Sequence, residues 1–159
     1  TLNPSSAASD VYKRQIFLKG MENFMGEYEI QSLFNSFLIS NAIFFAGNAF
    51  LLWVAFRASL GVRDNGGNLV TKILVSLFGL GIVFLNLQNL GFLQINWEST
   101  AFALSQLDTI SDNGQRFVDF LNITEAPTYS LIPTNPIFQV WWLVVIAMLL
   151  LPVWMKKED

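Results

Sequence analysis

The chain contains no cysteine and no histidine in its 159 residues. Without cysteine it can form no disulfide, and zinc or iron–sulfur sites held by thiolates are excluded. Without histidine it lacks the most frequent general base and a common ligand of haem and metal ions. We therefore predict no cofactor and no metal site, and a protein that is not an enzyme.

Charged residues are scarce as well. They make up 13% of the chain, while hydrophobic residues make up 53%, and an average protein is about 25% charged. The apolar residues gather in blocks longer than core helices need, which is typical of membrane-spanning helices. We therefore predict an all-α integral membrane protein that is surrounded by a lipid bilayer and has no nucleic-acid partner.

Three charge-free apolar segments are long enough to cross a bilayer: residues 36–56, 73–93 and 137–154. The third is short, but Asn135 suits a helix N-cap and Pro136 suits the first helical position. An interfacial or re-entrant third segment is the alternative. The absence of ionisable residues from all three segments argues against proton relays and most ion-coupled transporters.

The basic residues predict the orientation in the membrane. Five of them lie in the loop 57–72 or directly after the third span: Arg57, Arg63, Lys72, Lys156 and Lys157. The segment 94–136 carries only one, Arg116. Cytoplasmic loops are enriched in lysine and arginine. We therefore predict a bacterial inner-membrane protein with its N-terminus outside, its C-terminus in the cytoplasm, and a helical hairpin turn at residues 64–68.

Residues 1–20 have no apolar periodicity, which predicts a disordered tail. The stretch 5–15 resembles translated adapter sequence at the ends of chains assembled from environmental DNA, so we interpret the tail as non-native. An ordinary polar tail is the alternative, and its Lys13, Arg14 and Lys19 would then weaken the predicted orientation. Residues 21–159 are expected to form a single membrane domain.

The segment 94–136 is expected outside the cytoplasm and contains an amphipathic pattern. Apolar or small residues recur there at spacings of four and three: Ala103, Leu107, Ile110, Gly114, Phe117 and Leu121. The turn-forming residues 112–114 favour two short helices over one. We expect the apolar face to pack on protein, because basic residues that bind anionic lipid are nearly missing. Asp108, Asp112 and Asp119 form a candidate external interaction face; their spacing does not match a calcium-binding loop.

Polar amides occur within the first two spans, at Asn41, Asn48, Asn86, Gln88 and Asn89. Asn41 and Asn48 are seven residues apart and share a helix face. At about 1.5 Å per residue, Asn41 lies level with Asn86 and Asn89 in an antiparallel hairpin. We therefore expect a hydrogen bond from Asn41 to Asn86 or Asn89 that joins the two helices. A polar lining of a pore or ligand pocket is the alternative.

These features favour a non-enzymatic accessory or assembly subunit of a membrane complex, in contact with other membrane subunits or with copies of itself. Three helices leave much outer surface per residue, and the acidic external face offers a place for contact. The alternative is a homo-oligomeric channel or small-solute facilitator, lined by the asparagine and glutamine side chains of the first two spans.

Overall fold

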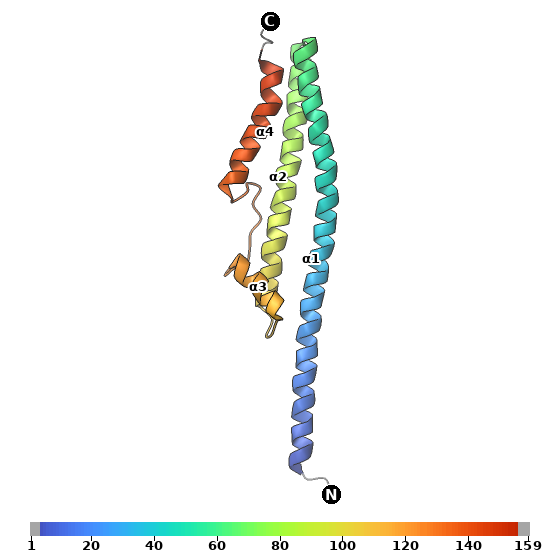
Figure 1. Cartoon of the computed structure of the whole chain (residues 1–159), viewed down its shortest axis with the longest axis vertical. Helices are drawn as coiled ribbons and strands as arrows, with labels where there is room; N and C mark the ends of the chain where they lie inside the picture. Colours follow the sequence, from blue (N-terminus) through green and yellow to red (C-terminus); the bar gives the residue numbers. More distant parts are fainter. Residues whose placement is uncertain (1–3, 156–159) are drawn as a thin grey trace. The chain divides into compact units, whose positions relative to one another are not determined.

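The computed structural model describes residues 4–155, and the side chains of residues 26–155. Between residues 4 and 155 the chain is helical and contains no strand. Four helices follow one another (Figure 1): α1 (Pro4–Asn65), α2 (Leu69–Ser105), α3 (Asp112–Leu121) and α4 (Pro136–Trp154). Three stretches, Gly26–Asn65, Leu69–Ser105 and Pro136–Trp154, are long and apolar enough to cross a membrane. The all-α class and three helices of spanning length are thus confirmed.

Helix α1 begins at Pro4, within the segment for which the sequence predicts disorder. Proline suits a first helical turn because no hydrogen bond is required from its nitrogen there. Residues 5–19 contain neither glycine nor proline, so the helix is not interrupted once it has formed. The structure describes the backbone of residues 4–20 as helical, and the interpretation of residues 1–20 as a non-native tail stays a prediction. Residues 1–3, Lys156 and Lys157 lie outside the described residues.

The chain divides into two compact units, where the sequence predicts a single membrane domain. Unit 1 consists of Thr1–Phe37 and Asn96–Thr128, and unit 2 consists of Leu38–Ile95 and Tyr129–Asp159. The break between α2 and α3 belongs to unit 1, whereas the α1–α2 turn and the whole of α4 belong to unit 2.

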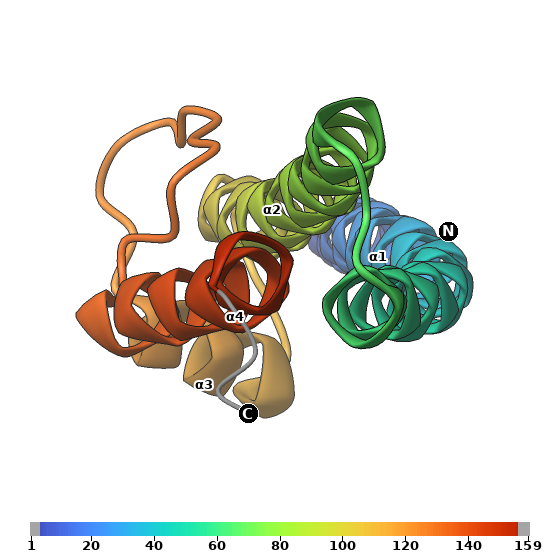
Figure 2. The same ribbon diagram turned by 90° about the horizontal axis from the view of Figure 1, so that it is seen from above.

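The core of unit 2 joins α1, α2 and α4. It is formed by six buried side chains: Ala55, Ile82, Val83, Trp142, Val145 and Leu149. Helix α4 lies beside α2 in both views (Figures 1 and 2). Gly79 of α2 lies at this contact, where a Cβ would meet the Leu149 side chain at 3.6 Å, an ordinary van der Waals distance. The Trp154 indole donates to the Ser76 hydroxyl at 3.0 Å and so fixes the end of α4.

The turn between α1 and α2 confirms the predicted hairpin. Gly66 has a φ of +71°, which favours glycine. The N–H groups of Gly66 and Gly67 both donate to the Val62 carbonyl, at 3.1 and 3.2 Å. The Asn68 side chain then accepts the Thr71 N–H at 2.8 Å and caps the start of α2. The turn therefore satisfies backbone groups that both helix ends would otherwise leave unpaired.

Most apolar side chains of the spanning helices point away from the core. Ile43 of α1 is 69% exposed and Leu143 of α4 is 65% exposed. Exposed apolar side chains along helices of this length are expected when the surrounding solvent is lipid. The three helices are therefore compatible with a membrane protein.

In unit 1 the helix break lies earlier than the sequence predicts. Helix α2 continues to Ser105 and α3 begins at Asp112, so the break covers residues 106–111 and not residues 112–114. Ser111 is the N-cap of α3, and its hydroxyl accepts the Gly114 N–H at 3.1 Å. A serine cap contributes about 0.5–2 kcal/mol, enough to offset the cost of about 1 kcal/mol for a helical glycine. The turn-forming residues are therefore accommodated in the first turn of a helix.

Candidate functional site

Glu27 is the one charged side chain that is buried among residues 26–155, with 5% of its surface exposed. Its carboxylate accepts hydrogen bonds from the Ser111 N–H at 2.8 Å, the Ser111 hydroxyl at 2.7 Å and the Gln31 amide at 2.9 Å. Because Ser111 caps α3, the carboxylate lies at the positive end of the helix dipole. The charge is thus stabilised by neutral donors and a helix terminus.

Gly114 makes this contact possible. A Cβ at residue 114 would lie 2.7 Å from Oε1 of Glu27, a separation that side chains do not tolerate. The sequence pattern does not single out Glu27, because its partner Ser111 is 84 residues away and the local pattern around Glu27 is polar. The only signal was the glycine at residue 114, which we interpreted as part of a turn.

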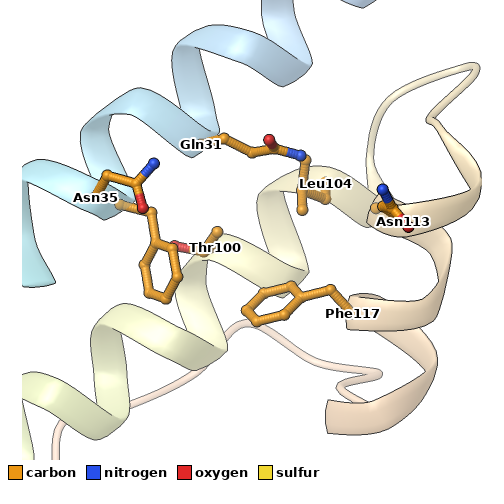
Figure 3. Close-up of a pocket in the computed structure, with 8 residues that line it drawn as sticks. Gln31, Asn35, Thr100, Leu104, Asn113 and Phe117 are labelled. Atoms are coloured by element: carbon orange, nitrogen blue, oxygen red, sulfur yellow. The ribbon is translucent and has the colours of Figure 1, made fainter.

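A pocket of about 220 Å³ lies beside this contact in unit 1 (Figure 3). Gln31 and Asn35 approach it from α1, Thr100 and Leu104 from α2, and Phe117 from α3. The pocket thus combines amide and hydroxyl groups with apolar walls, all within one unit.

An aromatic cluster closes one side of unit 1. The rings of Phe34, Trp97 and Phe117 lie with centroids 5.3, 5.6 and 5.5 Å apart, in edge-on or tilted arrangements that aromatic pairs prefer. Phe117 belongs to the apolar face predicted from the sequence. At Phe117 that face therefore packs on this chain itself, in agreement with the expected packing on protein.

The acidic residues of the predicted external face, Asp108, Asp112 and Asp119, are all exposed. Asp112 lies in the first turn of α3, and Asp119 accepts a hydrogen bond from Gln115 at 2.8 Å. No group of three or more acidic side chains converges on a metal-sized site within residues 26–155. The proposed role of these residues in contacting a partner stays a prediction.

The amides predicted from the sequence are gathered inside unit 2. The four asparagines are 5–9% exposed, although most side chains around them are exposed: Asn41, Asn48, Asn86 and Asn89. These four side chains therefore point toward the interior of unit 2. Contacts between helices require this burial, whereas side chains that line a water-filled pore would be exposed to water.

The expected hydrogen bond between Asn41 and Asn86 is not formed. The Asn86 amide donates at 2.9 Å to the Ile82 carbonyl of its own helix. Asn86 also shares a helix face with Ser76 and Gly79, which both contact α4. Equal depth of two residues in a hairpin was therefore not enough to predict a hydrogen bond between them. The face of α2 that carries Asn86 is directed toward α4 and not toward α1.

Two buried amide nitrogens lack a hydrogen-bond partner among residues 26–155, namely Nδ2 of Asn41 and Nδ2 of Asn89. An unpaired buried donor costs about 1–3 kcal/mol. Asn89 also lines a pocket of about 270 Å³, together with Phe44, Asn48, Leu85, Gln88 and Phe92. The sequence predicted the polar residues of this site, but the cavity beside them depends on how α1 and α2 pack.

Comparisons with known proteins give no relative: no family model, curated protein or solved structure matches this chain. Function is therefore inferred from the geometry of the two units.

Proposed function

We propose that this chain is a non-enzymatic accessory or assembly subunit of a membrane complex. The observation that carries the proposal is α3, a ten-residue helix outside the three spanning helices, fixed on one face and open on the other. A helix of this length is marginal in isolation. Its inner face is held by the contact of Glu27 with Ser111 and by the aromatic packing of Phe117.

The outer face of α3 combines an aromatic side chain with acidic ones. Phe120 is 79% exposed, the highest value among the large hydrophobic side chains of residues 26–155. Asp112 and Asp119 are seven residues apart, so they share a helix face next to Phe120. Aromatic residues are enriched at protein interfaces, and carboxylates favour a basic partner surface. A protein with an apolar pocket and a basic rim fits this face.

Co-purification in a mild detergent, with identification of bound proteins by mass spectrometry, tests the proposal. We expect a stoichiometric protein to accompany the wild-type chain and to be lost with Phe120→Ser. Ile132→Ser is the matched control, because Ile132 is also outside the spanning helices and is 64% exposed. A wild-type chain that elutes without any stoichiometric companion would overturn the proposal.

We further infer that the protein is inserted in a bacterial inner membrane, with its N-terminus outside and its C-terminus in the cytoplasm. Arg57, Arg63 and Lys72 gather around the α1–α2 turn, which supports a cytoplasmic position for that end of unit 2. At the same end, the Lys72 ammonium lies 5.8 Å from the Trp154 ring centroid. Tryptophan and lysine side chains together are typical of the headgroup region.

A homo-oligomeric channel or small-solute facilitator is the second candidate. The observation that favours it is the pocket lined by Asn48, Gln88 and Asn89. The burial of the asparagines supports it less, because a conducting path needs amides that water can reach. Solute flux into proteoliposomes containing the purified chain would favour this candidate, and its absence would leave the assembly role as the better account.

A further inference from the structure

The pocket in unit 1 has aromatic walls that are held in position before any molecule binds. Phe34 and Phe117 both line it, and their ring planes meet at 55° with centroids 5.6 Å apart. Trp97 packs against both rings, with centroid distances of 5.3 and 5.5 Å. The volume of about 220 Å³ is below the range of about 300–1,000 Å³ for drug-sized ligands, so the pocket suits a single small ring.

Three amide side chains line the same pocket and are accessible from it. Gln31 and Asn35 approach from α1 and Asn113 from α3, with Asn35 and Asn113 at opposite ends (Figure 3). The Gln31 amide donates to Glu27 at 2.9 Å, which orients the side chain and leaves its carbonyl oxygen as an acceptor. Asn35 and Asn113 are exposed, and their side chains form no hydrogen bond within residues 26–155. A molecule in the pocket therefore meets both donors and acceptors.

The lining carries no charge, and this limits the class of ligand. None of its eight residues is ionisable. Glu27, the partner of Gln31, is 5% exposed and already accepts three hydrogen bonds. An ionic ligand would find no counter-charge, and a purely apolar ligand would cover the amides without pairing them. What remains is a neutral molecule that has an apolar face and several hydroxyl groups.

We propose that this pocket binds one sugar ring, with a C–H face of the ring on Phe117 and its hydroxyl groups bonded to the three amides. The C–H groups of a sugar ring carry a small positive charge, and the face of an aromatic ring is negative. Each hydroxyl both donates and accepts, as an amide does. Two sources supply this chemistry: the glycosyl headgroup of a membrane lipid, and a saccharide dissolved in water. The inference goes beyond the proposed assembly role and is independent of a protein partner, because the purified chain binds the sugar alone.

The experiment uses the full chain in phosphatidylcholine nanodiscs, and co-elution with the disc establishes insertion separately. Thr100→Cys places the only thiol of the chain in the pocket lining and keeps all three amides. Its alkylation by N-ethylmaleimide is followed with methyl glucoside, galactoside or mannoside, each compared with sorbitol, which has hydroxyl groups but no ring. A lipid arm compares discs that contain glucosyl diacylglycerol with discs that contain diacylglycerol.

We expect the sugar-bearing member of at least one pair to slow the alkylation of Thr100→Cys. The rate should fall roughly threefold at a sugar concentration of about twice the dissociation constant. Ser99→Cys is the control, because Ser99 is exposed on α2 but does not line the pocket, and its rate should stay unchanged. Protection by the glycolipid alone assigns a lipid headgroup, protection by a free glycoside alone assigns a dissolved saccharide, and protection by both shows that the ring itself is recognised. No protection in any pair overturns the proposal.

Asn113→Ala should raise the dissociation constant for the protecting sugar by about two- to tenfold, as expected for the loss of one hydrogen bond. Gln115→Ala is the matched control, because Gln115 is an exposed amide on the same helix that does not line the pocket. Asn35→Ala should have the same effect from α1, so a folding defect of α3 in the first variant does not decide the outcome. Protection that both substitutions leave unchanged, or that Gln115→Ala weakens equally, contradicts binding at this site.

Discussion

At the scale of single residues, Glu27 connects α1 to the start of α3 in unit 1. Hydrogen bonds to a charged group contribute about 1.5–3 kcal/mol each, and removing one partner leaves the other buried and unpaired. The three donors to Glu27 come from only two residues, Ser111 and Gln31. The carboxylate therefore controls both the cap of α3 and the position of its first turn.

Glu27→Gln should lower the free energy of unfolding of unit 1 by about 1.5–3 kcal/mol. Glutamine keeps the shape of the side chain but replaces one acceptor oxygen by an NH₂ group, which has to face a donor of Ser111. Denaturant unfolding in detergent measures the change, followed by the fluorescence of Trp97 in a background where the other four tryptophans are replaced by phenylalanine. Glu29→Gln is the control, because Glu29 is exposed. Equal effects of the two substitutions would contradict a special role for Glu27.

Gly114→Ala should destabilise the protein, although alanine is the better helix former by about 1 kcal/mol. The new methyl group would lie 2.7 Å from Oε1 of Glu27, so either the carboxylate or α3 has to move. Gly81→Ala provides the opposite expectation, because a Cβ at residue 81 meets no atom within 4 Å. We expect Gly81→Ala to be neutral or stabilising in the same unfolding assay. Stabilisation by Gly114→Ala would show that the close contact is absent.

At the scale of elements, two faces of α2 make contacts with other helices. Asn86 lies on one of these faces and Asn89 on the other. Ser76 and Gly79 contact α4, and Asn86 continues their face. Asn89 lies in the pocket with Phe44 and Asn48 of α1. The order of residues along a helix follows from the sequence, but the direction of each face depends on where α4 packs.

Asn41→Leu and Asn86→Leu should have additive effects on stability, because the structure contains no bond between the two side chains. Asn41→Leu should cost little or even stabilise, since it removes an unpaired donor. Asn86→Leu should also cost little, because its bond is local to one helix. A double-mutant cycle in detergent measures this, and a coupling energy beyond about 0.5 kcal/mol would restore the direct bond expected from the sequence.

The positions of the spans were predictable, and their lengths were not. Runs without charge identified residues 73–93, but α2 extends to Ser105. Residues 94–105 are more polar, yet they contain neither glycine nor proline, so nothing stops the helix. A hydrophobicity pattern marks the part of a helix that prefers lipid, whereas a helix end depends on caps and breakers such as Ser111 and Gly66.

At the scale of the whole molecule, the division into two units was beyond sequence analysis. Unit 1 depends on contacts between residues far apart in the chain, such as Glu27 with Ser111 and Phe34 with Trp97 and Phe117. The residues next to each of them in the sequence do not indicate these contacts. That their side chains meet is visible only in the three-dimensional structure. The uneven distribution of lysine and arginine between the loops, by contrast, can be read from the whole sequence. It predicts the orientation in the membrane directly.

Single cysteines in this cysteine-free chain test the orientation. Thr124→Cys should react in intact cells with a thiol reagent that does not cross membranes, and Asn65→Cys should react only after the cells are opened. Both residues are exposed, so neither substitution disturbs a buried contact. Labelling of Asn65→Cys but not of Thr124→Cys in intact cells would reverse the proposed topology.

The distance in sequence between Glu27 and Ser111 also has a consequence for biosynthesis. The carboxylate is made 84 residues before its main partner, and ribosomes add about 5–20 residues per second. For roughly 4–17 s of its synthesis, each chain therefore carries this acid without the groups that later bury it. During that interval α2 is being made, and the hairpin of α1 with α2 is complete only when Ser105 has been added, shortly before Ser111, while α3 does not yet exist. The order of translation thus keeps the N-terminal part of α1 accessible until late, and α3 closes over Glu27 as one of the last events before α4 is made.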